Sequence, residues 1–109
     1  MAHQQNQFCI SACDACATAC DHCAAACLAE RQVSQLVDCI QLDWDCAALC
    51  RLASSAMARG SMQVNAICSN CANLCDACAT ECEQHQHPHC KECAQACREC
   101  AQACRTMAQ

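Results

Sequence analysis

The sequence predicts an all-α protein, an antiparallel up-down-up-down four-helix bundle with a cysteine-lined core. Two observations predict this fold class. The chain of 109 residues has 19 cysteines but only one glycine and one proline, a composition that favours long helices joined by short turns. The cysteines recur in alternating steps of three and four residues, which is the heptad spacing of helices that bury one stripe. The length corresponds to a single cysteine-rich domain over residues 1–109.

Three segments carry an unbroken cysteine stripe, and one carries a diluted stripe. The unbroken stripes are Cys9, Cys13, Cys16, Cys20, Cys23 and Cys27; Cys68, Cys71, Cys75, Cys78 and Cys82; and Cys90, Cys93, Cys97, Cys100 and Cys104. The diluted stripe holds Cys39, Cys46 and Cys50, with Leu36, Asp43, Ala53 and Met57 in the same register. We therefore expect helices at residues 7–29, 33–58, 61–84 and 88–106. Alanines beside the stripes allow the helices to approach closely, so the sulfur atoms line a narrow tube.

Three residues mark the expected helix ends. Gly60 can adopt the left-handed conformation that ends the second helix, and Ser61 is expected to cap the third. Pro88 suits the first turn of the fourth helix, where its missing N–H would have had no partner. Connections this short predict that neighbouring helices are antiparallel.

Charge and hydropathy narrow the classes of function. The net charge is −5 and the six Lys and Arg residues are scattered, which argues against a nucleic-acid partner. No apolar run is long enough to span a membrane. Residues 1–7 lack the basic and apolar regions of an export signal, so we expect a cytoplasmic protein. In a reducing compartment, cysteines on this scale indicate metal binding rather than a disulfide scaffold.

Three other roles for the cysteines fit the sequence less well. Six C-x-x-C steps on three helices are not typical of a dithiol redox enzyme, which uses one such pair in a βαβ context, and we expect no enzymatic activity. An iron–sulfur electron carrier would present its cysteines in the C-x₂-C-x₂-C-x₃-C-P run, which is absent. Cysteine as a mere small hydrophobic filler would forfeit on the order of 1 kcal/mol or more at each position that leucine could occupy.

The expected metal follows from softness and geometry. Thiolates select Cu(I), zinc or iron–sulfur clusters. Structural zinc prefers closed sets of four thiolates, whereas bridged Cu(I) can extend along a continuous column. If each sulfur bridges two copper ions, the capacity approaches about one ion per cysteine, with 19 as the upper limit. Zinc or cadmium sequestration of the metallothionein type stays open as an alternative.

The cysteine stripes, together with the turn His85-Gln86-His87-Pro88-His89-Cys90, resemble the bacterial copper storage proteins, and the lack of an export signal resembles their cytosolic branch. The resemblance covers Cys9 to Cys104. It implies Cu(I) storage in multinuclear thiolate clusters and tetramers of bundles. We expect such a store to release copper to a copper chaperone or an apo-cuproenzyme.

The two ends of the tube carry different side chains. His85, His87 and His89 are candidate entrance ligands, expected at one end with Cys27, Cys82 and Cys90; solvated turn residues are the alternative. Met57 and Met107 are candidate thioether ligands at the other end, where simple packing is the alternative. His3, His22 and Met62 lie outside the stripes, and the two histidines are expected on the surface.

Two features of the second helix remain. Asp43 is the one carboxylate on a stripe; it either hydrogen-bonds to a thiol or an end residue, or turns out to solvent. Val37, Ile40 and Trp44 form a ridge beside the stripe, with Trp44 expected to point outward. An exposed apolar ridge is typical of an oligomer contact, and a single exposed tryptophan without a role is the alternative.

Overall fold

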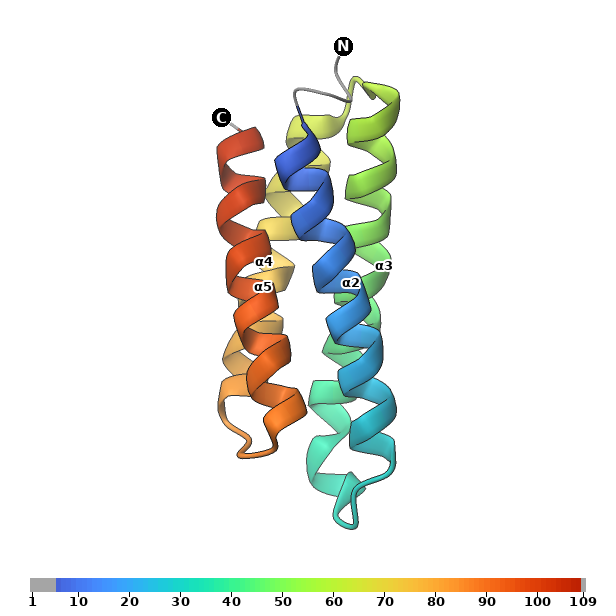
Figure 1. Ribbon diagram of the computed structural model, residues 1–109, viewed down its shortest axis with the longest axis vertical. Helices are drawn as coiled ribbons and strands as arrows, with labels where there is room; N and C mark the ends of the chain where they lie inside the picture. The colour runs from blue at the N-terminus through green and yellow to red at the C-terminus, as the bar shows by residue number, and fades with distance from the viewer. Residues whose placement is uncertain (1–5, 109) are drawn as a thin grey trace.

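The computed structural model describes residues 6–108, which fold into four long α-helices and one short 3₁₀ helix. Helix α2 spans Gln7–Leu28, η1 is the 3₁₀ helix Val33–Leu36, α3 spans Val37–Arg59, α4 spans Val64–Glu83 and α5 spans Pro88–Met107. The long helices run alternately up and down along a body of 47 × 19 × 18 Å (Figure 1). Both α2 and α4 pack beside α3 and α5. The predicted antiparallel bundle is confirmed.

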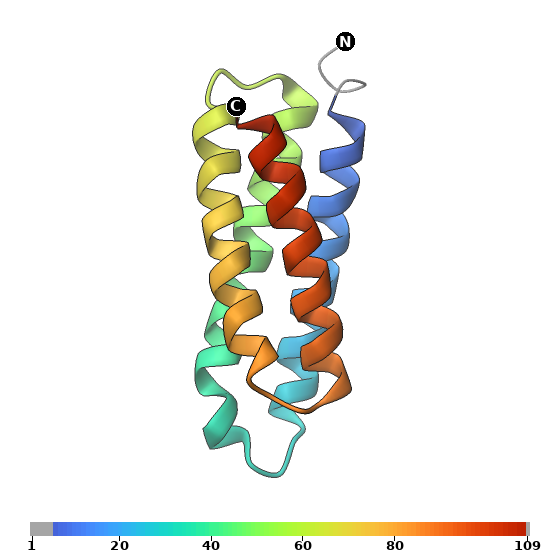
Figure 2. The same ribbon diagram turned by 90° about the vertical axis from the view of Figure 1, so that its left-hand side faces the viewer.

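The connections divide between the two ends of the bundle. The α2–η1 and α4–α5 connections lie together at the lower end in both views, and the α3–α4 connection lies at the upper end with the start of α2 and the end of α5 (Figures 1 and 2). None of the helices in residues 6–108 has the length and apolar content needed to cross a membrane.

The core is made of sulfur and small side chains. Each of the 19 cysteines is at most 2% exposed, because the heptad spacing turns every one toward the bundle axis. Buried alanines stand beside them on all four long helices. Large apolar residues are few in this core, with Leu36 and Met57 the largest fully buried ones.

The turn between α3 and α4 confirms one expected helix end and corrects another. Gly60 is left-handed, with φ 66° and ψ 42°, and ends α3. Its N–H donates to the Met57 carbonyl, and the Ser61 N–H donates to the Ala56 carbonyl, the paired bonds of a Schellman motif. The Ser61 hydroxyl oxygen accepts a hydrogen bond from the Gln63 N–H at 3.1 Å, but α4 begins only at Val64. The prediction that Ser61 caps the third helix is therefore wrong. The cap position of α4 belongs to Gln63.

The start of the second predicted helix also differs. The sequence predicts one helix from residue 33, whereas the structure has η1 and then α3, joined at Leu36 with φ −113° and ψ 9°, outside the α-helical region. A 3₁₀ turn winds more tightly than an α-helix. It brings Leu36 into the core, where it is 2% exposed, directly after the chain leaves α2.

The expected ridge on α3 is only partly exposed. Trp44 is 54% exposed and Val37 is 46% exposed, as predicted. Ile40 is only 5% exposed, so its predicted place on the surface is wrong. Ile40 stands one heptad before the buried Ala47 and thus belongs to the edge of α3 that packs on neighbouring helices. His22 is exposed as expected, and His3 lies outside the described residues.

Candidate metal centre

The 19 cysteines are all buried free thiols, and their sulfur atoms form one column along the bundle axis. Neighbouring Sγ atoms from different helices lie between 3.4 Å apart, for Cys39 and Cys82, and 4.0 Å apart, for Cys16 and Cys75. These are contact distances without covalent bonds. One metal ion can therefore reach several sulfur atoms at once with little movement of the helices.

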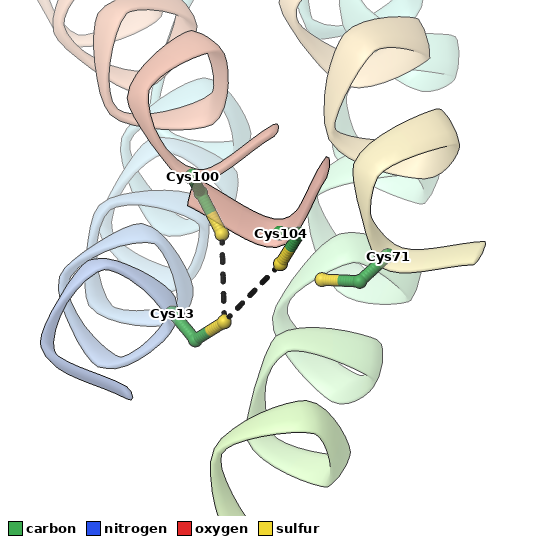
Figure 3. Close-up of side chains that lie close together, drawn as sticks. All are labelled: Cys13, Cys71, Cys100 and Cys104. Atoms are coloured by element: carbon green, nitrogen blue, oxygen red, sulfur yellow. Dashed lines mark hydrogen bonds between the residues drawn. The ribbon is translucent and has the colours of Figure 1, made fainter. Parts of the chain in front are cut away.

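The thiols cluster in overlapping groups of four whose sulfur atoms all lie within 4.8 Å of one another. Figure 3 shows the group at the upper end, where the sulfur of Cys13 on α2 lies 3.6 Å from those of Cys100 and Cys104 on α5 and faces that of Cys71 on α4. Further groups follow along the axis: Cys16, Cys46, Cys50 and Cys75; Cys16, Cys20, Cys46 and Cys97; Cys20, Cys78, Cys93 and Cys97; and Cys23, Cys27, Cys39 and Cys90. The three middle groups share members: Cys16 and Cys46 belong to two of them, and Cys20 and Cys97 also belong to two. This sharing suits ions bridged by common sulfurs better than isolated ions with separate ligand sets.

Burial raises the pKa of one thiol at each end of the column and so favours its protonated form. Desolvation raises the pKa of the Cys68 thiol to about 11. Desolvation is also the main cause that raises the pKa of Cys27 to about 11. Since the thiolate is the ligand, each protonated thiol that becomes a ligand must release its proton once, whether its sulfur then binds one ion or bridges two.

Asp43 on α3 is fully buried and points into the sulfur column, which decides between the alternatives left open by the sequence. Its Oδ1 accepts hydrogen bonds from the thiols of Cys78 and Cys93, each at 3.2 Å. At 3.8 Å, the Cys82 thiol also faces Oδ1 and the Cys39 thiol faces Oδ2. Burial, and to a smaller degree the neighbouring Cys93 and Cys39, raises the pKa of the Asp43 carboxyl from 3.8 to about 8. The column thus contains one oxygen donor among its sulfurs.

The lower end, which we call the histidine end, brings one imidazole onto the thiols. Nδ1 of His89 lies 3.5 Å from the sulfurs of Cys23 and Cys90 and 3.9 Å from that of Cys27. The imidazole can therefore supply a nitrogen ligand to the group that contains these cysteines. The opposite ring nitrogen, Nε2, lies 2.9 Å from a carboxylate oxygen of Glu30.

The other two histidines of this end do not face sulfur. His85 pairs through Nε2 with Glu81 at 2.8 Å, and Nδ1 of His87 lies 3.3 Å from Glu30. His85, His87 and Glu30 line a cleft of about 400 Å³ between the two connections. The expected placement of Cys27 and Cys90 with a histidine is confirmed for His89, whereas Cys82 contacts Cys39 and Asp43.

The upper end, which we call the methionine end, is closed by packing. Met57 is fully buried, and the partly buried Met107 packs against the core. The side-chain amide of the buried Asn6 donates to the Met57 carbonyl at 3.4 Å and ties the start of α2 to α3. Met62, by contrast, is 96% exposed.

Sequence reasoning missed Glu30 and Glu81, the acidic partners of the histidines. Glu81 stands four residues before His85, a spacing that predicts a helical pair. Glu30 is separated from His89 by 59 positions in the chain, so only the fold reveals that contact.

The fold and the site together define a helical-bundle metal-binding protein with a thiolate core. A family model described as copper storage protein matches residues 2–109, and the chain belongs to this family.

Solved structures of similar proteins agree. The chain is 45% identical to the Cu(I)-bound copper storage protein BsCsp3, with each chain covered in full and a TM-score of 0.92. It is 48% identical to apo copper storage protein 3 from Bacillus subtilis, covering 94% of this chain and 98% of that one, with a TM-score of 0.90. A cytosolic copper storage protein from Streptomyces lividans, in a structure of its copper loading with five coppers, is 39% identical, with 98% and 94% of the chains covered and a TM-score of 0.93.

The raised pKa of Asp43 predicts a pH dependence of the stability of the metal-free, reduced protein. The folded state holds this proton up to about pH 8, whereas the unfolded chain releases it near 3.8. The stabilisation is complete below the lower value and is lost as the pH rises through the higher one, with a slope of at most about 1.4 kcal/mol per pH unit. Urea unfolding at pH 5, 6, 7 and 8 should show this fall in wild type, and Asp43→Asn should flatten it. Asp45→Asn, on the exposed side of α3, is the matched control; an equal slope in Asp43→Asn and wild type would contradict the assignment.

Proposed function

We propose that this protein stores Cu(I) in the cytosol, binding many ions through core thiolates in multinuclear clusters. The observation that carries the proposal is the continuous column of 19 buried free thiols in overlapping groups. Membership of the copper storage family and the Cu(I) bound by the similar BsCsp3 support the same metal. The cytosolic location rests on the S. lividans relative. The proposed role is to bind and release an ion, with no chemical transformation.

Copper fits the column better than the alternative metals. Cu(I) accepts low coordination and bridging thiolates, so a sulfur shared by two groups, such as that of Cys16 or Cys46, is a suitable ligand for both. Structural zinc is held by closed sets of four thiolates, so the 19 cysteines would serve only about four or five such ions and the overlap between groups would go unused. Iron–sulfur clusters need inorganic sulfide among the cysteines, and neighbouring thiols in direct contact leave no space for it.

We assign all 19 cysteines as copper ligands. His85, His87 and His89 form the proposed entrance, in which His85 and His87 meet solvent in the cleft and His89 touches the first thiols. Met57 and Met107 are proposed to close the opposite end, by packing and as reserve thioether donors. A copper chaperone or an apo-cuproenzyme is the proposed recipient of released copper.

Anaerobic titration of the reduced protein with Cu(I) tests the storage function. We expect filling well beyond four equivalents, toward the upper limit of about one ion per cysteine, in competition with a strong chromogenic Cu(I) chelator. The melting temperature should rise with each increment, because the unfolded chain cannot reproduce the clusters.

A parallel titration with zinc serves as the comparison. Saturation at about four or five zinc ions with a higher affinity than copper would favour zinc storage. A melting temperature that copper leaves unchanged would argue against a site in the core.

The entrance is tested by replacing His85, His87 and His89 together with alanine. Stopped-flow uptake from a Cu(I) donor complex should become slower, while the final capacity stays nearly the same because the thiols are intact. His22→Ala, which changes an exposed imidazole on α2, is the matched control. Equal uptake by the triple variant and wild type would reduce these histidines to turn residues.

We further propose that the protein is a homotetramer of bundles. The exposed Trp44 and Val37 on α3 support an apolar contact between copies, since large apolar groups on a surface favour burial in an interface. Trp44→Glu should shift the sedimentation coefficient of the apo protein toward that of a smaller assembly, whereas Met62→Glu, at another exposed apolar residue, should not. Identical sedimentation of Trp44→Glu and wild type would place the contact elsewhere or leave the chain monomeric.

A further inference from the structure

One carboxylate at the histidine end serves two imidazoles. Glu30 follows the C-terminal end of α2, and its Oε2 lies 2.9 Å from Nε2 of His89 and 3.3 Å from Nδ1 of His87. The two rings stack, with centroids 5.2 Å apart and planes within 4°. The Glu30 side chain is about one-third exposed and lines the cleft, whereas His89 is 11% exposed. Glu30 therefore stands between the solvent-facing cleft and the imidazole that touches the thiols.

The hydrogen bond to Glu30 determines which nitrogen of His89 can bind a metal. A neutral imidazole carries one N–H, and a carboxylate can only accept a hydrogen bond. The contact with Glu30 therefore places the proton of His89 on Nε2. The lone pair is then on Nδ1, the atom that lies 3.5 Å from the sulfurs of Cys23 and Cys90. The opposite tautomer would present an N–H to the thiols and could not accept copper.

We propose that Glu30 is the positioning residue of the copper entrance. Its carboxylate fixes His89 as the Nε2–H tautomer, holds the ring with Nδ1 facing the thiols of Cys23, Cys27 and Cys90, and anchors His87 in front of it. This inference rests on the proposed entrance and adds the group that orients its metal-binding imidazole. Carboxylates that orient a metal-binding histidine in this way typically change affinity or activity by 10- to 100-fold when removed.

The same end provides a matched comparison. Glu81 and His85 form a second carboxylate–imidazole pair, at 2.8 Å, within α4 and the residues that follow it. His85 has no sulfur contact among those found in residues 6–108. Removing the carboxylate of Glu81 therefore makes the same chemical change at the same end without releasing an imidazole that faces thiols.

The first experiment reads the tautomer directly. Long-range ¹H–¹⁵N NMR of the reduced apo protein, at a pH where the imidazoles are neutral, should show His89 as the Nε2–H tautomer in wild type. Glu30→Ala should convert His89 to a mixture of tautomers. Glu30→Gln should retain most of the wild-type signature, because the amide oxygen still accepts a hydrogen bond. This variant also keeps the role of Glu30 testable if the alanine variant is unstable. An unaltered His89 tautomer in Glu30→Ala overturns the proposal.

The second experiment measures uptake. Glu30→Ala should take up Cu(I) from a donor complex about tenfold more slowly than wild type, with unchanged capacity, and Glu30→Gln should lie between them. Glu81→Gln should match wild type. The triple variant Glu30→Ala/His87→Ala/His89→Ala should be no slower than His87→Ala/His89→Ala, because Glu30 acts through those two imidazoles.

The failures of the two proposals are distinguishable. If His89→Ala slows uptake and Glu30→Ala does not, the entrance stands and the role of Glu30 is overturned. If His89→Ala takes up copper at the wild-type rate, the entrance itself is rejected, and with it the role of Glu30 in uptake. A slowing by Glu81→Gln equal to that by Glu30→Ala would point to a general effect of negative charge at this end and would also overturn the positioning role.

Discussion

Contact between buried sulfur atoms is the constraint on which the rest of the structure depends. A thiol is much smaller than a leucine side chain, so helices that meet through cysteines must lie close together, and the buried alanines beside the stripes permit this approach. The result is a core with little apolar area for its length, in which Leu36 and Met57 are the largest fully buried apolar side chains. Such a core gains less from the hydrophobic effect than a leucine core of the same length. The geometry of this core allows metal–sulfur bonds to add to its stabilisation.

The sulfur column is interrupted at one level by Asp43, and the physical reason for its state is burial. An ionised carboxylate among thiols would have no compensating cation, so the neutral acid is favoured and its pKa rises to about 8. A cation bound among Cys39, Cys78, Cys82 and Cys93 would favour the ionised form instead. The proton of this carboxyl, like those of the thiols, is therefore coupled to the charge of whatever occupies the column.

The fold could be predicted largely from the sequence because one pattern encodes it. The heptad spacing of the cysteines predicts both the helices and the face that each helix buries. Gly60 marks the end of α3 and Pro88 the start of α5, because each residue constrains the backbone in its own way. Ser61 was misassigned because residues that can cap a helix start can also complete a helix end, and the competition is decided by the turn as a whole. The burial of Ile40 depends on which neighbouring helix lies beside it, information that a single helical pattern does not contain.

The metal site, like the fold, could be predicted from the sequence only in part. The cysteine positions could be predicted, since each follows from the helical period, whereas the contacts at the histidine end depend on how two connections meet. His85 continues the stripe of α4 by sequence, yet it pairs with Glu81, and His89 in the first turn of α5 is the imidazole placed on sulfur. The proline before it begins that helix and sets the direction of the turn.

The two ends of the bundle differ in how their polar groups are satisfied, by partners within the protein or by solvent. At the methionine end, Asn6 satisfies the Met57 carbonyl and a thioether fills the core, so polar groups are paired within the protein. At the histidine end, carboxylates and imidazoles meet both the cleft and the outermost thiols. An ion that leaves water must exchange its hydration for ligands, and the thiols must lose protons to solvent as it binds. Groups that accept protons and offer a nitrogen lone pair at the water boundary suit both steps, and they support the entrance proposed at the histidine end.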